Sequence, residues 1–252
     1  MTTLSIPRQF RGPPFTANGG YICGVLSNAV GGRGTSMLRS GVPLDTEVTL
    51  TFADDGSATL TNAEGTLLGT AKPADDASIP PPITPPSVED ARRFGDRGVF
   101  AKRPLHRGCF SCCIEREAGE GLGVFVGPIE GAPEGRCAGV WTPHANFADE
   151  NGLIPDEITW GALDCPGSMA WFEKGTPVGL LGTMSGEVLE KPRAGETYVV
   201  TAWTLAAEGR KHYAGVALHD ASGKLMARGG QIWIARAAPA APPRVDTQGV
   251  TA

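Results

Sequence analysis

Apolar and polar positions follow the same order twice along the chain, with a helix-like segment leading into strand-like runs separated by glycine-containing turns. A helical spacing of apolar residues covers residues 19–30, and alternation follows at residues 37–43, 47–52, 58–61 and 66–71. The second helical pattern covers residues 155–172, and alternation follows at residues 178–189, 197–206, 212–219 and 224–235. Because a period near 3.6 indicates a helix and a period of 2 a strand, we predict an α+β protein with two similar halves.

Short sequence matches support an internal duplication. The turn Asn62-Ala-Glu-Gly65 resembles Asp220-Ala-Ser-Gly223, and Gly24-Val-Leu26-Ser27 resembles Gly161-Ala-Leu163-Asp164. The second half has further strand-like runs before its helix, at residues 121–127 and 136–141, for which the first half has no room. We therefore interpret the first half as a truncated copy.

A proline-rich break separates the halves. Residues 73–86 contain six prolines in fourteen positions, a composition that favours extended backbone and disfavours helices and central strands. We expect an N-terminal half at residues 1–72, a linker at 73–104 and a C-terminal half at 105–236. Residues 237–252 lack periodicity and are expected to form a disordered tail.

Composition narrows the functional classes. The 35 glycines and 21 prolines, with only 19% charged residues, indicate many turns and short strands. A net charge of −5 disfavours nucleic-acid binding, and no apolar run is long enough to span a bilayer. The six cysteines, two of them adjacent, do not suggest a disulfide framework, so reduced thiols and a cytoplasmic location are expected.

The second helical segment carries an unusual carboxylate. Asp164 falls in mid-helix beside apolar positions, on a face shared with Trp160 and Ser168. Pro166 has no N–H group and should distort the helix near Asp164. An isolated aspartate usually points to solvent or bonds to the backbone, but this conflict with helix propensity favours a functional role.

The first helical segment begins with Asn18-Gly19-Gly20-Tyr21. Two glycines at a helix N-terminus expose backbone N–H groups, which could stabilise an oxyanion. A simple Asn-Gly turn that leads into a helix is the alternative.

Together these segments resemble the hotdog-fold thioesterases. In the PaaI-like branch, a Cys-Phe-x-Cys-Gly segment and a Gly-Leu strand precede a His-Gly-Gly helix start, with a carboxylate nine residues after the histidine. The second half here has the segment Cys109-Phe110-Ser111-Cys112-Cys113, then Gly121-Leu122, and Asp164 nine residues after Pro155. The first half has Asn18-Gly19-Gly20, with Ser27 nine residues after Asn18.

The resemblance implies a double hotdog, in which two long helices are each wrapped by an antiparallel sheet and the halves pair as a pseudo-dimer. It implies an acyl-CoA thioesterase without a cofactor, in which the Gly19 and Gly20 amides face Asp164 across the halves and Ser168 orients the carboxylate or the water. The mirror site would bring Asp156 and Glu157 to Ser27 and lack suitable groups.

If the resemblance holds, five residues are expected to bind the substrate: Asn18, Tyr21, Trp160, Arg103 and Arg107. The two arginines lie in a basic stretch, residues 92–107, that could meet the phosphates of coenzyme A. A solvated linker is the alternative interpretation of that stretch. The expected partner is a small acyl thioester, and the chain is expected to be a monomeric pseudo-dimer or a homodimer.

Other functions stay open. A catalytically weak hotdog protein could bind an acyl thioester or another apolar ligand, and a hotdog hydratase would need a histidine close to Asp164. A zinc site at Cys109 and Cys112, with His106, Cys113 and Cys137 nearby, is rejected because the second paired cluster of a structural zinc site is missing. No metal is therefore predicted.

Overall fold

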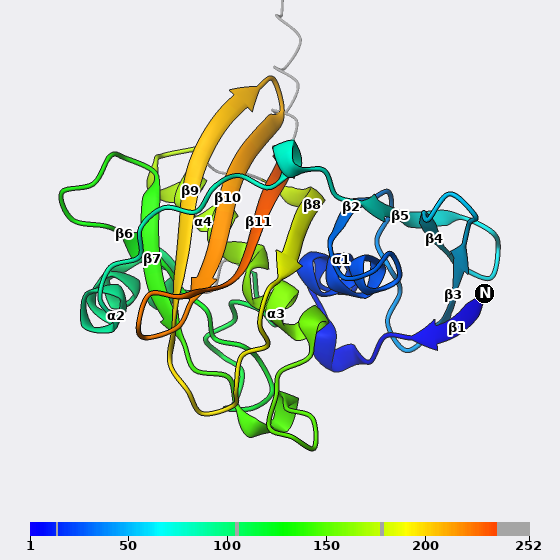
Figure 1. Ribbon diagram of the computed structural model, residues 1–252, viewed down its shortest axis with the longest axis horizontal. Coiled ribbons are helices and arrows are strands. Elements are labelled where there is room, and N and C mark those ends of the chain that lie inside the picture. Colours follow the sequence, from blue (N-terminus) through cyan, green and yellow to red (C-terminus); the bar gives the residue numbers. More distant parts are fainter. Residues whose placement is uncertain (14, 104–105, 177–178, 236–252) are drawn as a thin grey trace, which may run out of the picture.

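Eleven strands form one antiparallel sheet in the part of the chain that the computed structural model describes, residues 1–13, 15–103, 106–176 and 179–235. Their order across the sheet is β1-β3-β4-β5-β2-β8-β11-β10-β9-β7-β6 (Figure 1). The first half contributes β1 (Thr2–Ser5), β2 (Gly34–Leu38), β3 (Glu47–Phe52), β4 (Ala58–Thr61) and β5 (Leu67–Pro73). The second half contributes β6 (Gly127–Pro128), β7 (Arg136–Trp141), β8 (Leu180–Val188), β9 (Tyr198–Glu208), β10 (Lys211–His219) and β11 (Leu225–Ile234).

The two halves have the same strand topology. In each, the strand that follows the helix lies at the centre of the molecule, next to the last strand of that half. These central strands, β2 and β8, pair antiparallel, with Gly34 opposite Gly186 and Met37 opposite Thr183. The equivalent strands of the two halves therefore run outward from the β2·β8 junction in matching order. This arrangement confirms the double hotdog predicted from the sequence.

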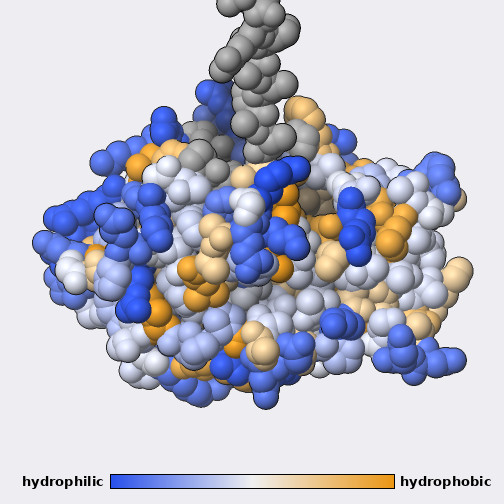
Figure 2. Space-filling model, turned by 90° about the horizontal axis from the view of Figure 1, so that it is seen from above, coloured by the Kyte–Doolittle hydropathy of each residue, from blue (hydrophilic) through white to orange (hydrophobic). Residues whose placement is uncertain are grey.

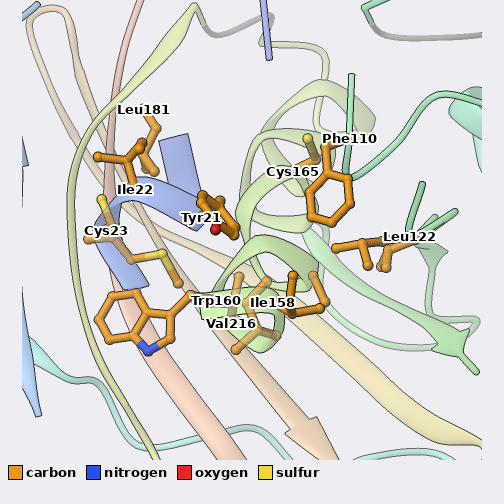
Figure 3. Packing of buried hydrophobic residues seen from close by; sticks show 14 of the residues in the cluster. Tyr21, Ile22, Cys23, Phe110, Leu122, Ile158, Trp160, Cys165, Leu181 and Val216 are labelled. Atoms are coloured by element: carbon orange, nitrogen blue, oxygen red, sulfur yellow. The ribbon is translucent and has the colours of Figure 1, made fainter. Parts of the chain in front are cut away.

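Helices α1 (Gly19–Asn28) and α3 (Asp156–Ala162) pack against each other, and α4 (Asp164–Glu173) follows α3 almost directly. Close approach of α1 and α3 needs glycine, because a Cβ at Gly24 would lie 2.5 Å from Glu157 Cα. Figure 3 shows Tyr21, Ile22 and Cys23 of α1 beside Trp160 of α3. These helices and the sheet enclose one apolar core that runs through both halves.

The segment predicted as a linker carries a helix that the sequence analysis did not expect, α2 (Val88–Arg97). Ser87 begins it by accepting a hydrogen bond from the Asp90 N–H at 3.1 Å. Its apolar face places Ala91 and Phe94 against Ala138 and Val199, at the β6/β7 end of the sheet (Figure 1). The prolines keep residues 79–86 extended, but the sequence after them forms an amphipathic helix.

Most predicted elements agree with the structure within a few residues. The strand predicted at residues 121–127 is wrong, since only Gly127–Pro128 joins the sheet there and Gly121 forms just an isolated bridge with Ala118. The helix predicted at residues 155–172 is divided into α3 and α4 at Leu163. The disordered tail predicted at residues 237–252 lies outside the described residues.

Short 3-10 turns complete the described secondary structure: Arg8–Phe10, Asp76–Ser78, Val99–Ala101 and Ala145–Phe147. Among the described residues, no helix is both long and apolar enough to cross a bilayer. On the face that Figure 2 shows, hydrophobic residues lie scattered between hydrophilic ones.

Candidate functional site

Asn18 occupies the N-cap of α1 and is fully buried. Its Oδ1 accepts a hydrogen bond from the Tyr21 N–H at 2.9 Å, which satisfies one of the free donors of the first helical turn. Its Nδ2 is thereby turned toward the second half, where it donates to Asp164 Oδ2 at 2.6 Å and to Ser111 Oγ at 3.0 Å. The residue that replaces the histidine of the family pattern thus both caps the helix and holds the carboxylate.

Asp164 lies at the break between α3 and α4. Pro166 has no N–H group to donate to the carbonyl four residues earlier, so the helix cannot continue regularly through this point. Gln231 of β11 binds the backbone at this break, because its Nε2 donates to the Leu163 carbonyl at 2.8 Å and to the Asp164 carbonyl at 2.9 Å. Trp233 Nε1 in turn donates to Gln231 Oε1 at 2.9 Å. The sheet therefore fixes the backbone that presents Asp164.

Gly20 brings α1 into contact with Asp164. A Cβ at position 20 would lie 2.6 Å from Asp164 Cβ and 2.6 Å from the Trp160 carbonyl oxygen, so no larger residue fits without moving a helix. Gly19 and Gly20 are the first two residues of α1, whose N–H groups have no partner within the helix. The structure thus brings the helix start of the first half to the carboxylate of the second.

Burial dominates the electrostatics of this site. Asp164 is only 4% exposed, and this desolvation, together with the nearby Cys109, raises its pKa to about 7. The Gly20 backbone N–H and the Asn18 amide act in the opposite direction. Asp164 Oδ1 has no hydrogen-bond partner among the described residues. A carboxyl group of this kind can gain or lose a proton near neutral pH.

A cavity of about 440 Å³ opens onto Asp164. Gly19 and Ile22 of α1 line it from the first half, together with Leu38 and Arg39. Residues of the second half close the other side: His106, Asp164, Cys165, Leu181, Arg210 and Trp233. Its wall is mostly apolar, with a carboxylate, a helix start and two arginines, which suits a ligand that has an apolar part and an anionic part.

Two predicted residues contribute to this cavity directly, Gly19 and Asp164. Asn18 and Gly20 contact Asp164 but do not line the cavity themselves. Three others are buried but do not line the cavity: Tyr21, Trp160 and Ser168. Tyr21 stacks on Phe10 with ring centroids 4.3 Å apart, and its pKa is raised to about 12 by burial and by Glu157.

The two arginines predicted to bind coenzyme A do not line this cavity. Arg103 lies over the Phe172 ring, 6.0 Å from its centroid. Arg107 is exposed, 3.8 Å from Glu115, and lines a separate open hollow with Arg8, Arg11 and Arg116. The arginines that do line the cavity are Arg39 and Arg210.

Sequence reasoning missed Ser111 and Gln231. Ser111 Oγ donates to the Gly161 carbonyl at 2.6 Å while it accepts from Asn18, so it links the Cys-Phe-Ser-Cys segment to the helix pair. Gln231 is only 2% exposed, and its one available signal was a polar residue inside an apolar strand. A buried amide of this kind needs partners, which here are the carbonyls beside Asp164.

Comparisons with solved structures agree with the observed architecture. A proposed thioesterase from Novosphingobium aromaticivorans DSM 12444 is 16% identical, with 93% of this chain and 95% of that one covered and a TM-score of 0.61. A proposed thioesterase II from Thermobifida fusca YX is 14% identical, with coverage of 93% and 92% and a TM-score of 0.58. The TesB protein of Mycobacterium avium subspecies paratuberculosis is 12% identical, with coverage of 92% and 91% and a TM-score of 0.57.

No protein-family model matches the chain. No curated protein matches it either. At these identities the similarity to solved structures concerns the fold, and it extends over both halves of the chain.

Proposed function

We propose that this protein is an acyl-CoA thioesterase with one site, at Asp164. The observation that carries the proposal is the buried Asp164 carboxylate on the cavity wall, held by Asn18 and packed against Gly20 at the start of α1. The proteins of similar architecture described as thioesterases support it. The six described cysteines are free thiols, which suits a cytoplasmic enzyme.

Hydrolysis needs a donor for the carbonyl oxygen and a base or nucleophile for the carbonyl carbon. The N–H group of Gly19, which lines the cavity at the start of α1, would stabilise the oxyanion together with the positive end of the helix dipole. Asp164 would either take a proton from the attacking water or attack the carbon itself to give an anhydride, which water then cleaves. In both routes the coenzyme A thiolate leaves with the electron pair of the C–S bond.

The cavity wall suggests how the substrate would lie. The acyl chain would pack on Ile22, Leu38 and Leu181, while the anionic coenzyme A would lie toward Arg39 and Arg210. Arginine suits phosphate because its planar group donates two parallel hydrogen bonds. A cavity of about 440 Å³ favours an acyl group of moderate size.

The test is hydrolysis of a panel of acyl and aroyl CoA esters, in which the release of free thiol measures the rate. Wild type should hydrolyse at least one member, and Asp164→Asn should lose that activity. Removing the positive charge of Arg39 and Arg210 together should raise KM for CoA esters more than for short thioesters that lack the nucleotide. Turnover unchanged in Asp164→Asn would refute the assignment of the site.

Binding without catalysis is a second candidate, favoured by the engagement of Asp164 Oδ2 with Asn18 at 2.6 Å. A carboxylate tied to an amide is less free to act as a nucleophile. The same panel separates the candidates, because a binding protein would retain CoA esters in equilibrium dialysis without releasing thiol.

A hydratase is a third candidate, because His106 lines the same cavity as Asp164. His144, the histidine considered from the sequence, instead accepts a hydrogen bond from the Asn146 N–H at an exposed site. Loss of the conjugated absorbance of an enoyl-CoA without thiol release would favour hydration over hydrolysis.

A further inference from the structure

Three cysteine side chains converge beside Asp164. Cys109 and Cys112 come from the loop that precedes β6, and Cys165 from the first turn of α4. All three are at most 3% exposed, and their sulfur atoms lie within 4.8 Å of one another. Cys109 Sγ and Cys165 Sγ are 3.8 Å apart. Figure 3 shows Cys165 beside Phe110, which follows Cys109 in the chain.

We infer that Cys109, Cys112 and Cys165 form a binding site for a thiophilic divalent ion, with Zn²⁺ as the best fit. With Zn–S bonds of about 2.3 Å and tetrahedral angles, two sulfur ligands lie about 3.8 Å apart. The Cys109–Cys165 separation already has this value. Cys112 completes the triangle within the 4.8 Å limit, so a shift of at most about 1 Å brings it to ligand geometry.

The ligand loop is held in place before any ion binds. The Cys113 N–H donates to the Cys109 carbonyl, the Leu122 N–H to the Phe110 carbonyl and the Val124 N–H to the Ser111 carbonyl. Cys165 is fixed separately, because Gln231 anchors the carbonyls of the two preceding residues. A site whose ligands are preorganised loses little conformational entropy when the ion binds.

Zinc binds cysteine as the thiolate, so a bound cation would stabilise all three sulfur atoms of this buried cluster in their charged form.

Neighbouring Cys113 shows that this convergence is specific. It lies next to Cys112 in the chain and is equally buried, yet its sulfur accepts from the Gly108 N–H at 3.1 Å and is not part of the cluster. From the sequence, zinc was not predicted, because the chain has no second cysteine pair of the kind found in structural zinc sites. The third thiol comes instead from the helix that carries Asp164, and no spacing rule connects the two segments.

Three protein ligands leave a fourth coordination position, which water can fill. Cys165 also lines the cavity, so this position has a route for exchange with solvent. The inference rests on the sulfur geometry and not on the proposed thioesterase activity. Its test therefore measures metal and not turnover.

The experiment is equilibrium dialysis of the reduced, chelator-treated chain against Zn²⁺, with elemental analysis, and a parallel titration with Co²⁺. Wild type should bind one Zn²⁺ per chain, and its Co²⁺ form should show thiolate charge-transfer absorption. Cys165→Ser should weaken Zn²⁺ binding by more than about 100-fold, since even loss of a group that only supports a ligand costs about 10- to 100-fold. Cys113→Ser, the matched control, should bind Zn²⁺ as wild type does.

Three outcomes would overturn the site. Reduced wild type without stoichiometric Zn²⁺ would refute it, and so would a Co²⁺ spectrum without thiolate absorption. Neither measurement depends on whether a variant folds. Equal affinity of Cys165→Ser and wild type would place the bound ion elsewhere.

Discussion

The two ends of the α1·α3 helix pair are built from the same residue types but differ in environment. At one end Asn18 donates to Asp164 at 2.6 Å, and at the other Asn28 donates to Glu157 Oε2 at 3.0 Å. Each end also has a glycine that permits close approach. A Cβ at Gly20 would lie 2.6 Å from Asp164 Cβ, and one at Gly24 would lie 2.5 Å from Glu157 Cα.

Burial separates these two ends. Asn18 and Asp164 are 0% and 4% exposed and lie at a cavity, whereas Asn28 is exposed and Glu157 partly so. Ser27 lies at the same end as Asn28 and Glu157. It donates to the Gly32 carbonyl at 2.9 Å, just after the C-terminus of α1. Both ends thus pair an asparagine amide with a carboxylate beside a glycine, but of the two carboxylates only that of Asp164 is buried at a cavity.

The largest expected contrast is catalytic. Asp164→Asn should lower kcat for the best CoA ester by about 10²- to 10⁴-fold, the usual contribution of a positioned base. Glu157→Gln makes the equivalent change at the other end and should leave kcat within about twofold of wild type. Steady-state kinetics of both variants test the contrast, and an equal loss in both would contradict a single active site.

A second contrast concerns stability against pH. The folded-state pKa of Asp164, about 7, exceeds its ordinary value, so the folded chain keeps a proton that the unfolded chain releases. Its contribution to stability is complete below about pH 4 and is lost as the pH rises through about 7. From pH 5 to pH 8, Asp164→Asn should therefore gain on the order of 2–3 kcal/mol relative to wild type.

Urea unfolding at both pH values measures this gain. The protein is first treated with a chelator, so that no metal ion adds its charge near Asp164. Glu157→Gln is the control and should show a difference from wild type that hardly changes with pH. A pH-independent difference for Asp164→Asn would mean that burial does not perturb this carboxyl group.

The sequence predicted those features of the fold and the site that depend on local residue pattern. Alternation predicted β3 and β4 with their observed limits, because each has one face in the core. Asp164 stood out as a local conflict with helix propensity, and Gly19 and Gly20 as exposed backbone donors at a helix start. The helix break was expected from Pro166, although Leu163 was not identified as its position.

Contacts between distant segments were not predictable in the same way. Gln231, Ser111 and Cys165 meet the site only after the strands and helices are in place, and nothing in their local sequence specifies a partner. For the same reason the sequence did not indicate that Arg39 and Arg210 line the cavity, since a basic run indicates charge but not which cavity it faces. Helix α2 was missed because prolines directly before it dominated the composition of its segment.

A third contrast uses the two glycines. Gly20→Ala and Gly24→Ala should each destabilise the fold by about 1–3 kcal/mol, because either methyl group forces α1 and α3 apart. Only Gly20→Ala should also lower kcat, since its methyl group displaces Asp164. Thermal unfolding and kinetics of the pair test this, and a loss of kcat at both positions would show that activity depends on helix spacing alone.

The smallest contrast separates two roles of Asn18, which are to cap α1 and to lower the pKa of Asp164. Asn18→Ala should cost about 0.5–2 kcal/mol for the lost cap of α1, whereas Asn28→Ala, at an exposed site, should change stability by less than about 0.5 kcal/mol. The Asn18 amide also lowers the pKa of Asp164, so its removal should move the acid limb of kcat/KM to higher pH. Asn28→Ala should leave that limb in place. A destabilised Asn18→Ala variant with an unmoved acid limb would reduce Asn18 to a helix cap, because loss of the cap alone changes stability but not the titration of Asp164.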